Sequence, residues 1–222
     1  MINLGSTSIA DVKFGSQQMS KAYHGADLVW SNLAQYEFSN SSAYMTGSSG
    51  SSALGFTITD KLPSGSTRQE GAWNIFANNS RSMFVYMSKN ATTIVNFVFP
   101  DELGDVILLD IKGIQVSASG AGYSRAGSVT ILTSPLSKAA TDDDTNGANG
   151  FRVIKTISGS TQYNNFFTNT YGNNVLHPPT VKTLRIKFSS ANGGSTPSEK
   201  YKMRLLVNPD NLAAWKAKYN IS

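Results

Sequence analysis

The sequence predicts an all-β protein: an antiparallel, jelly-roll-like β-sandwich that follows a small N-terminal β-repeat module and precedes a short C-terminal helix. Three observations predict this class. The first 30 residues repeat every ten residues and carry a Gly at the same position of each unit. Later stretches alternate apolar and polar residues with a period of two, which is typical of β-strands. A stretch with helical spacing closes the chain.

These patterns divide the chain into four regions. Residues 1–32 are the N-terminal β-repeat module, residues 33–55 a Ser/Gly-rich link, residues 56–207 the β-sandwich and residues 208–222 the C-terminal helix. The link is expected to be a loop, because the Ser and Gly residues around Ser48–Ser52 favour turns and flexible segments.

The N-terminal module consists of three decapeptides, MINLGSTSIA, DVKFGSQQMS and KAYHGADLVW. A Gly occupies the fifth position of each, and Gly readily adopts the positive φ of a tight turn. We therefore expect a stack of short strands joined by tight turns. Ten residues cannot bury their own apolar face, so the module must dock on the rest of the chain or on another protein. The expected anchoring residues are Leu4, Phe14, Met19 and Trp30.

The module also resembles a known repeat. Ile2-Asn-Leu-Gly5, Lys13-Phe-Gly15 and Ser20-Lys-Ala-Tyr-His-Gly25, followed by Leu28-Val-Trp30, resemble a short N-terminal repeat of bacteriophage structural proteins, found mostly in tail or fibre components. The resemblance covers about the first 30 of 222 residues. His24 departs from the repeat, in which this position is usually apolar. A plain β-meander within an ordinary domain is the alternative.

The resemblance implies a structural component of a bacteriophage virion, tail- or fibre-associated, that projects its β-sandwich for assembly or host-surface contact. A capsid decoration or head-fibre protein is one alternative, and a carbohydrate-binding module that recognises host surface glycans is another. The implied partners are other virion proteins and further copies of the chain, with a homotrimer as first choice. The implied location is the virion, assembled in the host cytoplasm. The sequence does not distinguish tail from capsid.

The sandwich strands are predicted from apolar runs and period-two alternation. They are residues 72–77, 83–87, 92–99, 106–112, 114–117, 129–132, 151–157, 184–188 and 201–207. The near-continuous apolar run at 106–112 predicts a central strand that is buried on both faces. Charges at the alternate positions Arg185, Lys187, Lys202 and Arg204 are expected to face solvent.

Part of this pattern has a second, looser resemblance. Ile107–Val116, Thr183–Phe188 and Met203–Val207 resemble the galactose-binding-like jelly roll in the texture of their strands. The resemblance implies two antiparallel sheets of about eight strands in total. It also implies ligand-binding loops at one end of the sandwich.

The C-terminal helix is predicted from its start signals. Asn208 can cap it, Pro209 suits the first helical position, and Asp210 favours the positive end of the helix dipole. Trp215 then shares one face with Leu212. The preferred interpretation of Trp215 is a hydrophobic lid on the sandwich, and the alternative is a peg into a neighbouring virion subunit.

Composition excludes several classes of protein. The chain has no Cys, which excludes disulfides and zinc–thiolate sites. Its apolar runs are too short to span a membrane, and no secretory signal begins it. The net charge is +5, but the Lys and Arg residues are scattered, so we expect no nucleic-acid partner. Charged residues make up only 15% of the chain, which suits a surface rich in Ser, Thr and Asn.

Catalysis and metal binding have little support in the sequence. Asp142, Asp144 and Asn146 have the spacing of the first half of an EF-hand-like calcium loop, but Val153 stands where the bidentate Glu is expected. An acidic turn without metal is the alternative, and no other cofactor is expected. Neither His24 nor His177 belongs to a recognisable catalytic motif, so we expect a protein that is not an enzyme.

A group of aromatic residues lies in a polar stretch. Rings beside Asn and Thr are typical of sugar-binding loops, because rings stack on apolar sugar faces while amides bond hydroxyl groups. The same composition is typical of subunit contacts, and of residues that cap a core. These three interpretations stay open for Tyr163, Phe166, Phe167 and Tyr171.

Overall fold

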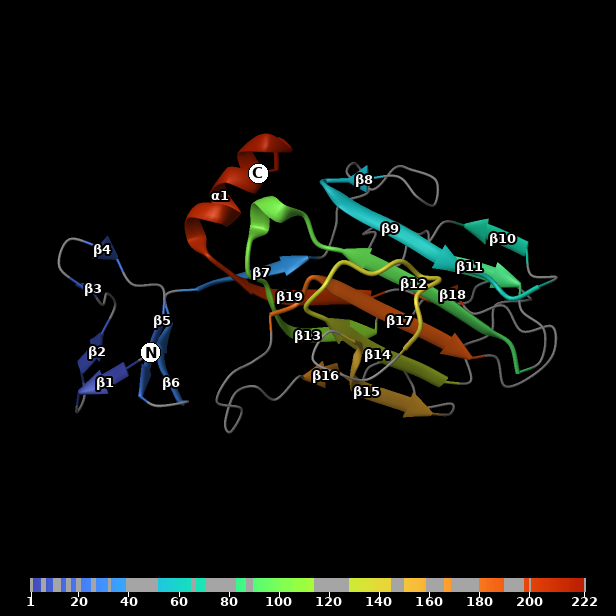
Figure 1. Ribbon diagram of the computed structural model, residues 1–222, viewed down its shortest axis with the longest axis horizontal. Helices are drawn as coiled ribbons and strands as arrows, with labels where there is room; N and C mark the ends of the chain where they lie inside the picture. The colour runs from blue at the N-terminus through green and yellow to red at the C-terminus, as the bar shows by residue number, and fades with distance from the viewer. Residues whose placement is uncertain are drawn as a thin grey trace.

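The computed structural model describes residues 2–4, 7–9, 13–14, 17–18, 21–24, 27–31, 33–38, 52–64, 67–70, 83–86, 90–113, 128–144, 150–158, 166–168, 180–189, 198–199 and 201–221. These residues are mostly strands of two antiparallel sheets that form a β-sandwich, with one short C-terminal helix (Figure 1). The predicted all-β sandwich is confirmed. In the part of the chain that is described, no helix is long and apolar enough to cross a membrane.

The larger sheet has six strands in the order β15-β14-β17-β12-β9-β8. They are β8 (Ser52–Ala53), β9 (Phe56–Lys61), β12 (Thr92–Val98), β14 (Ser128–Ser134), β15 (Arg152–Ser158) and β17 (Thr183–Ser189). Strand β17 lies between β12 and β14, with Ile186 opposite both Val95 and Ile131. The predicted alternation of this strand is confirmed, because Leu184, Ile186 and Phe188 belong to the core.

The smaller sheet has four strands in the order β16-β13-β19-β7. They are β7 (Ala34–Phe38), β13 (Ile107–Gly113), β16 (Phe166–Thr168) and β19 (Tyr201–Val207). The central place predicted for the apolar run is confirmed, since β13 lies between β16 and β19. Strand β7 lies inside residues 33–55, the predicted link, and pairs with β19 at the edge of the sheet. Its partner is distant in the chain, so local composition does not reveal it.

A third, small sheet has the order β10-β11-β18. Its strands are β10 (Thr67–Glu70), β11 (Met83–Tyr86) and β18 (Ser198–Glu199). Strand β11 lies within the strand predicted at residues 83–87. The strands predicted at residues 72–77 and 114–117 lie outside the described residues.

Each N-terminal decapeptide forms its own two-stranded antiparallel hairpin. The strand pairs are β1 (Ile2–Leu4) with β2 (Thr7–Ile9), β3 (Lys13–Phe14) with β4 (Gln17–Gln18), and β5 (Lys21–His24) with β6 (Asp27–Ser31). Leu4 pairs with Thr7, Phe14 with Gln17 and His24 with Asp27, so the reversal occurs at the same phase of each decapeptide.

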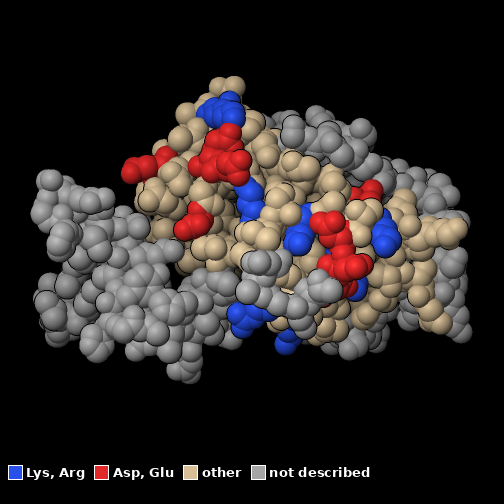
Figure 2. Space-filling view, in the orientation of Figure 1, with Lys and Arg blue, Asp and Glu red and all other residues tan. Residues whose placement is uncertain are grey.

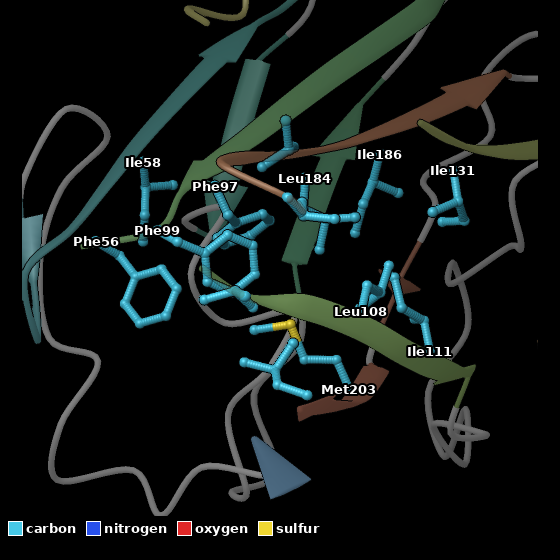
Figure 3. Close-up of a cluster of buried hydrophobic side chains, with 14 of the residues drawn as sticks. Phe56, Ile58, Phe97, Phe99, Leu108, Ile111, Ile131, Leu184, Ile186 and Met203 are labelled. Atoms are coloured by element: carbon cyan, nitrogen blue, oxygen red, sulfur yellow. The ribbon is translucent and has the colours of Figure 1, made fainter. Parts of the chain in front are cut away.

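The core lies between the two large sheets (Figure 3). Its side chains alternate along β9, β12, β14, β17 and β19, as the pleat of a β-strand requires, whereas on β13 a bulge between Leu108 and Asp110 shifts the alternation. They come from both layers and include Phe56, Ile58, Val95, Phe97, Phe99, Leu108, Ile111, Val129, Ile131, Leu184, Ile186, Phe188, Met203, Leu205 and Val207.

One edge of the six-stranded sheet is modified in a way that discourages further strand pairing. The edge strand β15 has a bulge where it pairs with residues 131–132, and Lys155 is exposed opposite Ile131. Bulges and charged side chains are common devices that keep sheet edges from pairing with other chains. The bulge and Lys155 therefore disfavour pairing of β15 with a strand of another chain.

The helix α1 (Pro209–Lys218) follows β19 directly. The predicted cap is confirmed, since Asn208 Oδ1 accepts the backbone N–H groups of Asp210 (2.9 Å) and Asn211 (3.3 Å). A short 3-10 helix, η2 (Asp101–Leu103), lies beside α1. The helix covers one end of the sandwich, next to β7 and β8 (Figure 1).

Candidate functional site

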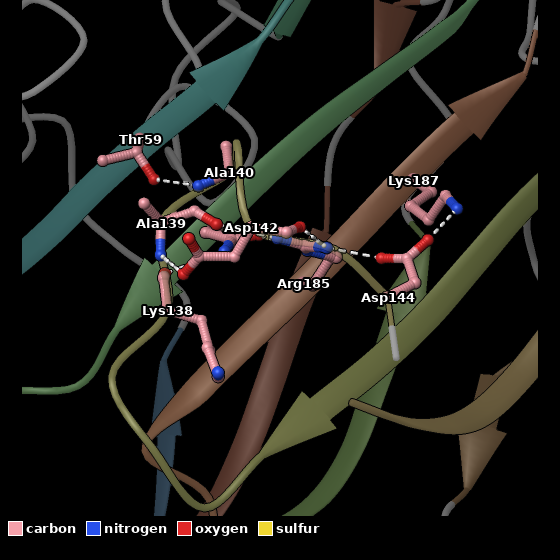
Figure 4. A network of polar contacts seen from close by, with 9 residues as sticks. Thr59, Lys138, Ala139, Ala140, Asp142, Asp144, Arg185 and Lys187 are labelled. Carbon is pink, nitrogen blue, oxygen red and sulfur yellow. Dashed lines mark hydrogen bonds and ion pairs between the residues drawn. The ribbon is translucent and has the colours of Figure 1, made fainter. Parts of the chain in front are cut away.

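The outer face of the six-stranded sheet carries a buried cation. Arg185 lies between Leu184 and Ile186, so strand alternation directs it away from the core. Its exposure is nevertheless 0%. The prediction that Arg185 faces solvent is therefore wrong, because a loop covers it. This covering loop, residues 135–144, follows β14 and crosses the outer face of the sheet (Figure 4).

The guanidinium of Arg185 binds the backbone of the covering loop. Its Nη1 donates to the carbonyl oxygen of Asp142 (2.8 Å) and its Nη2 to that of Ala139 (2.7 Å). Its Nε donates to Oδ1 of Asn96 on the neighbouring strand β12 (2.9 Å). One side chain thus links two strands of the sheet to the loop above them.

The charge of Arg185 is compensated from two sides. Its guanidinium forms an ion pair with Asp144, which also binds Lys187 two residues along β17. The ring of Phe151 lies 3.8 Å from the guanidinium carbon, measured to the ring centroid. A buried arginine is stable only when paired and hydrogen-bonded, and this one meets both conditions.

Further hydrogen bonds attach the covering loop to the sheet. The hydroxyl of Thr183 donates to the carbonyl of Leu136 (2.7 Å) and accepts the N–H of Lys138 (3.0 Å). The hydroxyl of Thr59 accepts the N–H of Ala140 (2.9 Å). The loop is therefore held along its length by β17 and β9 as well as by Arg185.

The carboxyl of Asp144 responds to these surroundings. Partial burial works to raise its pKa, but hydrogen bonds from Lys187 and Arg185 outweigh burial and hold the pKa below its usual value. Asp144 is consequently ionised throughout the neutral range, and both of its oxygens are engaged by cations of this chain.

The predicted calcium ligands can be placed in part. Asp144 is paired with two cations, and Oδ2 of Asp142 accepts the N–H of Ala139 (2.8 Å). Asn146 lies outside the described residues. Among the residues that the structure describes, no group of three or more His, Cys, Asp or Glu could hold a metal. Calcium binding at this loop stays a prediction.

The outer face of the four-stranded sheet carries a second set of charges. Arg204 of β19 lies opposite Asp110 of β13, and its Nε donates to Asp110 Oδ2 (2.7 Å). Arg204 Nη2 donates to the same oxygen. On the other side Arg204 lies opposite Glu37 of β7, which binds Lys202 at 3.2 Å. Lys202 and Arg204 are partly exposed, so they do not share the covered environment of Arg185.

Asp110 is the buried member of this second set. It is 1% exposed, and its Oδ1 has no hydrogen-bond partner among the described residues. The hydrogen bonds that Arg204 donates to Asp110, together with the attraction of Asp110 and Glu37, raise the pKa of Arg204 despite partial desolvation. A signal for this residue existed in the sequence, because Asp110 is the only acidic residue within the apolar run 106–112.

The C-terminal helix closes the sandwich through Trp215. This side chain is fully buried, and its indole N–H donates to the carbonyl of Leu54 (2.8 Å). Its ring meets Tyr36 of β7 edge-on, with centroids 5.6 Å apart, and Phe56 at 6.3 Å. The interpretation of Trp215 as a lid on the sandwich is confirmed.

The residues predicted to anchor the chain lie on the N-terminal hairpins. Leu4 lies in β1, Phe14 in β3 and Trp30 in β6, whereas Met19 lies outside the described residues. Of the two histidines, His24 is in β5 and His177 is outside the described residues.

The aromatic group is split by the structure. Phe166 and Phe167 lie in the edge strand β16, where Phe166 is opposite Lys112 and Phe167 opposite Ile111. Tyr163 and Tyr171 lie outside the described residues. Because opposite residues share a face, the register places Phe166 with the charged row of Asp110 and Arg204, and Phe167 on the opposite face of the sheet.

Charges of both signs are mixed on the visible described surface. Figure 2 shows Lys and Arg residues next to Asp and Glu residues on this face, without one continuous basic patch. This arrangement agrees with the scattered basic residues of the sequence. Comparisons with protein-family models and with curated proteins find no match for this sequence.

Proposed function

We propose that the chain is a structural component of a bacteriophage virion, tail- or fibre-associated, anchored by its N-terminal repeat. The observation that carries the proposal is the three-unit repeat with its Val-Trp ending, which resembles the N-terminal repeat of phage structural proteins. The hairpins support it. Isolated two-stranded hairpins are marginal in water, so three separate ones call for a partner surface.

The sandwich is suited to project from such an anchor. Its end next to β7 is closed by Trp215, and its long edge at β15 is guarded by a bulge and by Lys155. Strand β7 begins at Ala34, three residues after β6 ends at Ser31, so the anchor leads almost directly into the sandwich.

We also propose that the chain is a homo-oligomer, with a trimer as first choice, and that it docks on other virion proteins. Burial of apolar surface between copies stabilises an assembly by about 25 cal/mol per Å². The hairpins offer the surface, because each is a two-stranded sheet among the residues that the structure describes. Sedimentation of the purified chain over a wide dilution series tests this part of the proposal.

Imaging of the intact particle tests the proposal as a whole. Particles that carry the chain with a tag after Ser222 should show the tag on the tail or a fibre, and a tag before Met1 should lie closer to the particle body. Label on the capsid would support the alternative of a decoration or head-fibre protein. Absence of the chain from purified particles would refute the virion role.

Host-glycan binding is the second candidate function. The observation that favours it is the position of Phe166 on the edge strand β16, in register with the charged outer face of the four-stranded sheet. Aromatic rings beside paired charged groups are common in carbohydrate sites. A projecting sandwich could carry both roles in one molecule.

A further inference from the structure

On the outer face of the four-stranded sheet, one arginine lies between two acidic residues of the neighbouring strands. Arg204 of β19 lies opposite Asp110 of β13 on one side and opposite Glu37 of β7 on the other. Side chains opposite each other in antiparallel strands share a face, with Cβ atoms about 5 Å apart. Lys202, two residues along β19, shares this face and binds Glu37 at 3.2 Å.

Asp110 is the buried residue of this row and binds Arg204. Its side chain is buried, and a single oxygen, Oδ2, accepts both donors of Arg204. Its other oxygen, Oδ1, has no hydrogen-bond partner in the part of the chain that the structure describes. An unpaired buried oxygen costs about 1–3 kcal/mol, so packing stability alone does not explain the arrangement. What the arrangement achieves is a guanidinium of fixed orientation.

Arg204 retains donors for a ligand. Within the part of the chain that the structure describes, Arg204 donates hydrogen bonds from Nε and Nη2, and its Nη1 donates none. The side chain is 31% exposed. A fixed guanidinium fork is the preferred receptor for a carboxylate, because two parallel N–H groups match its two oxygens.

The neighbouring positions add positive charge and an aromatic residue. Lys112 of β13 lies opposite Lys202 in one direction and opposite Phe166 in the other. By register, the positions of Lys112, Lys202 and Arg204 lie on the same face as those of Asp110 and Glu37, so the described positions of this face hold one more basic residue than acidic residues. This excess favours an anionic ligand, while Glu37 can accept hydroxyl groups.

We propose that this face binds an acidic saccharide, with Arg204 holding the sugar carboxylate and Glu37 and Lys202 holding hydroxyl groups. Asp110 acts as a positioning residue that orients Arg204. The proposal deepens host-surface contact and rests on that part of the proposed function, but its test requires only the purified chain.

The test measures binding of the full-length chain to polygalacturonate, alginate and polysialic acid, each compared with its carboxyl-reduced form. At least one acidic polymer should bind, and its reduced form should bind at least about tenfold more weakly. Arg204→Gln should lose about tenfold in affinity for the acidic polymer. Asp110→Asn should reduce the difference in affinity between the acidic polymer and its carboxyl-reduced form. A purely structural role of Asp110 would leave this difference unchanged.

The matched control is Lys155→Gln, which removes one positive charge from β15 in the other sheet. It should leave affinity within about twofold if binding is local. Equal losses for Arg204→Gln and Lys155→Gln would show attraction by net charge alone and overturn the proposal, as would no binding to any of the three polymers. Melting curves of each variant confirm folding. Presence of the chain in particles without polymer binding would refute this site and leave the virion role intact.

Discussion

Arg185 lies fully buried beneath Asp144, and the two form an ion pair between the centre of the six-stranded sheet and the loop that covers it. The guanidinium also binds Asn96 and two loop carbonyls. Strand β17 therefore does more than fill the core with its apolar face. Its polar face also binds the covering loop, together with Thr59 on β9.

Arg185→Met should destabilise the protein by about 3–5 kcal/mol, because it leaves Asp144, Asn96 and the loop carbonyls without their common donor. Urea denaturation measures the change. Lys187→Gln is the matched control, since it also removes a cation from Asp144 but at a partly exposed position. It should cost about 1 kcal/mol or less. Similar values for the two variants would contradict the central role of Arg185.

Acid should weaken the attachment of the loop in a specific pH range. The folded pKa of Asp144 lies below its unfolded value, so its stabilising contribution is present above about pH 4 and is lost as pH falls through the folded pKa. Melting temperatures of the native chain and of Asp144→Asn should therefore converge below pH 4. The shifts of the exposed pairs at Asp101 and Glu102 act equally in both proteins. A constant difference down to pH 2 would contradict this assignment.

Trp215→Ala should cost about 3–5 kcal/mol, since it opens a cavity at the end of the core and removes the ring contacts with Tyr36 and Phe56. Trp215→Phe should cost less, about 1–3 kcal/mol, because it keeps a ring but leaves the Leu54 carbonyl unpaired. Thermal unfolding followed by circular dichroism ranks the two. Both variants lose the hydrogen bond to Leu54, so an equal cost would mean that the retained ring contributes nothing and would contradict the packing role of Trp215.

The turn beneath the helix should be sensitive to a single methyl group. Gly55 has φ +79°, and a Cβ there would lie 2.4 Å from the Tyr219 hydroxyl and 2.9 Å from Pro100 Cβ. Gly104 also has positive φ, but its Cβ would meet only the amide of Asn211, which can rotate away. Gly55→Ala should thus destabilise more than Gly104→Ala, for which the left-handed backbone costs about 1–2 kcal/mol. The reverse order, measured by urea denaturation, would contradict the packing of α1.

Much of the fold was predictable because it depends on patterns of residues that are close together in the sequence. The alternation of β17 and β19 and the cap of α1 are properties of neighbouring residues, and all three are confirmed. Strand β7 was not recognised, because its residues precede a Ser/Gly-rich stretch and its pairing partner β19 is far along the chain.

The candidate sites depend on contacts that no local pattern encodes. Alternation assigns Arg185 to the outer face correctly but says nothing of the loop that buries it. The partners Asn96 and Asp144 lie 89 and 41 residues away in sequence. The pairing of Asp110 with Arg204 likewise joins residues 94 positions apart. Only the presence of a carboxylate in an apolar run gave a signal for the second set of charges.

The most direct test of the virion role is incorporation of a chain that begins at Leu33. This truncation removes the three hairpins and keeps the whole of β7. It should unfold cooperatively and be absent from particles assembled in cells that lack the native chain, whereas the full-length chain restores normal incorporation. A full-length variant with Leu4, Phe14 and Trp30 changed to Ser separates loss of the docking surface from loss of length, and it should fail in the same way. Incorporation of the truncated chain at the native level would contradict anchoring by the N-terminal repeat.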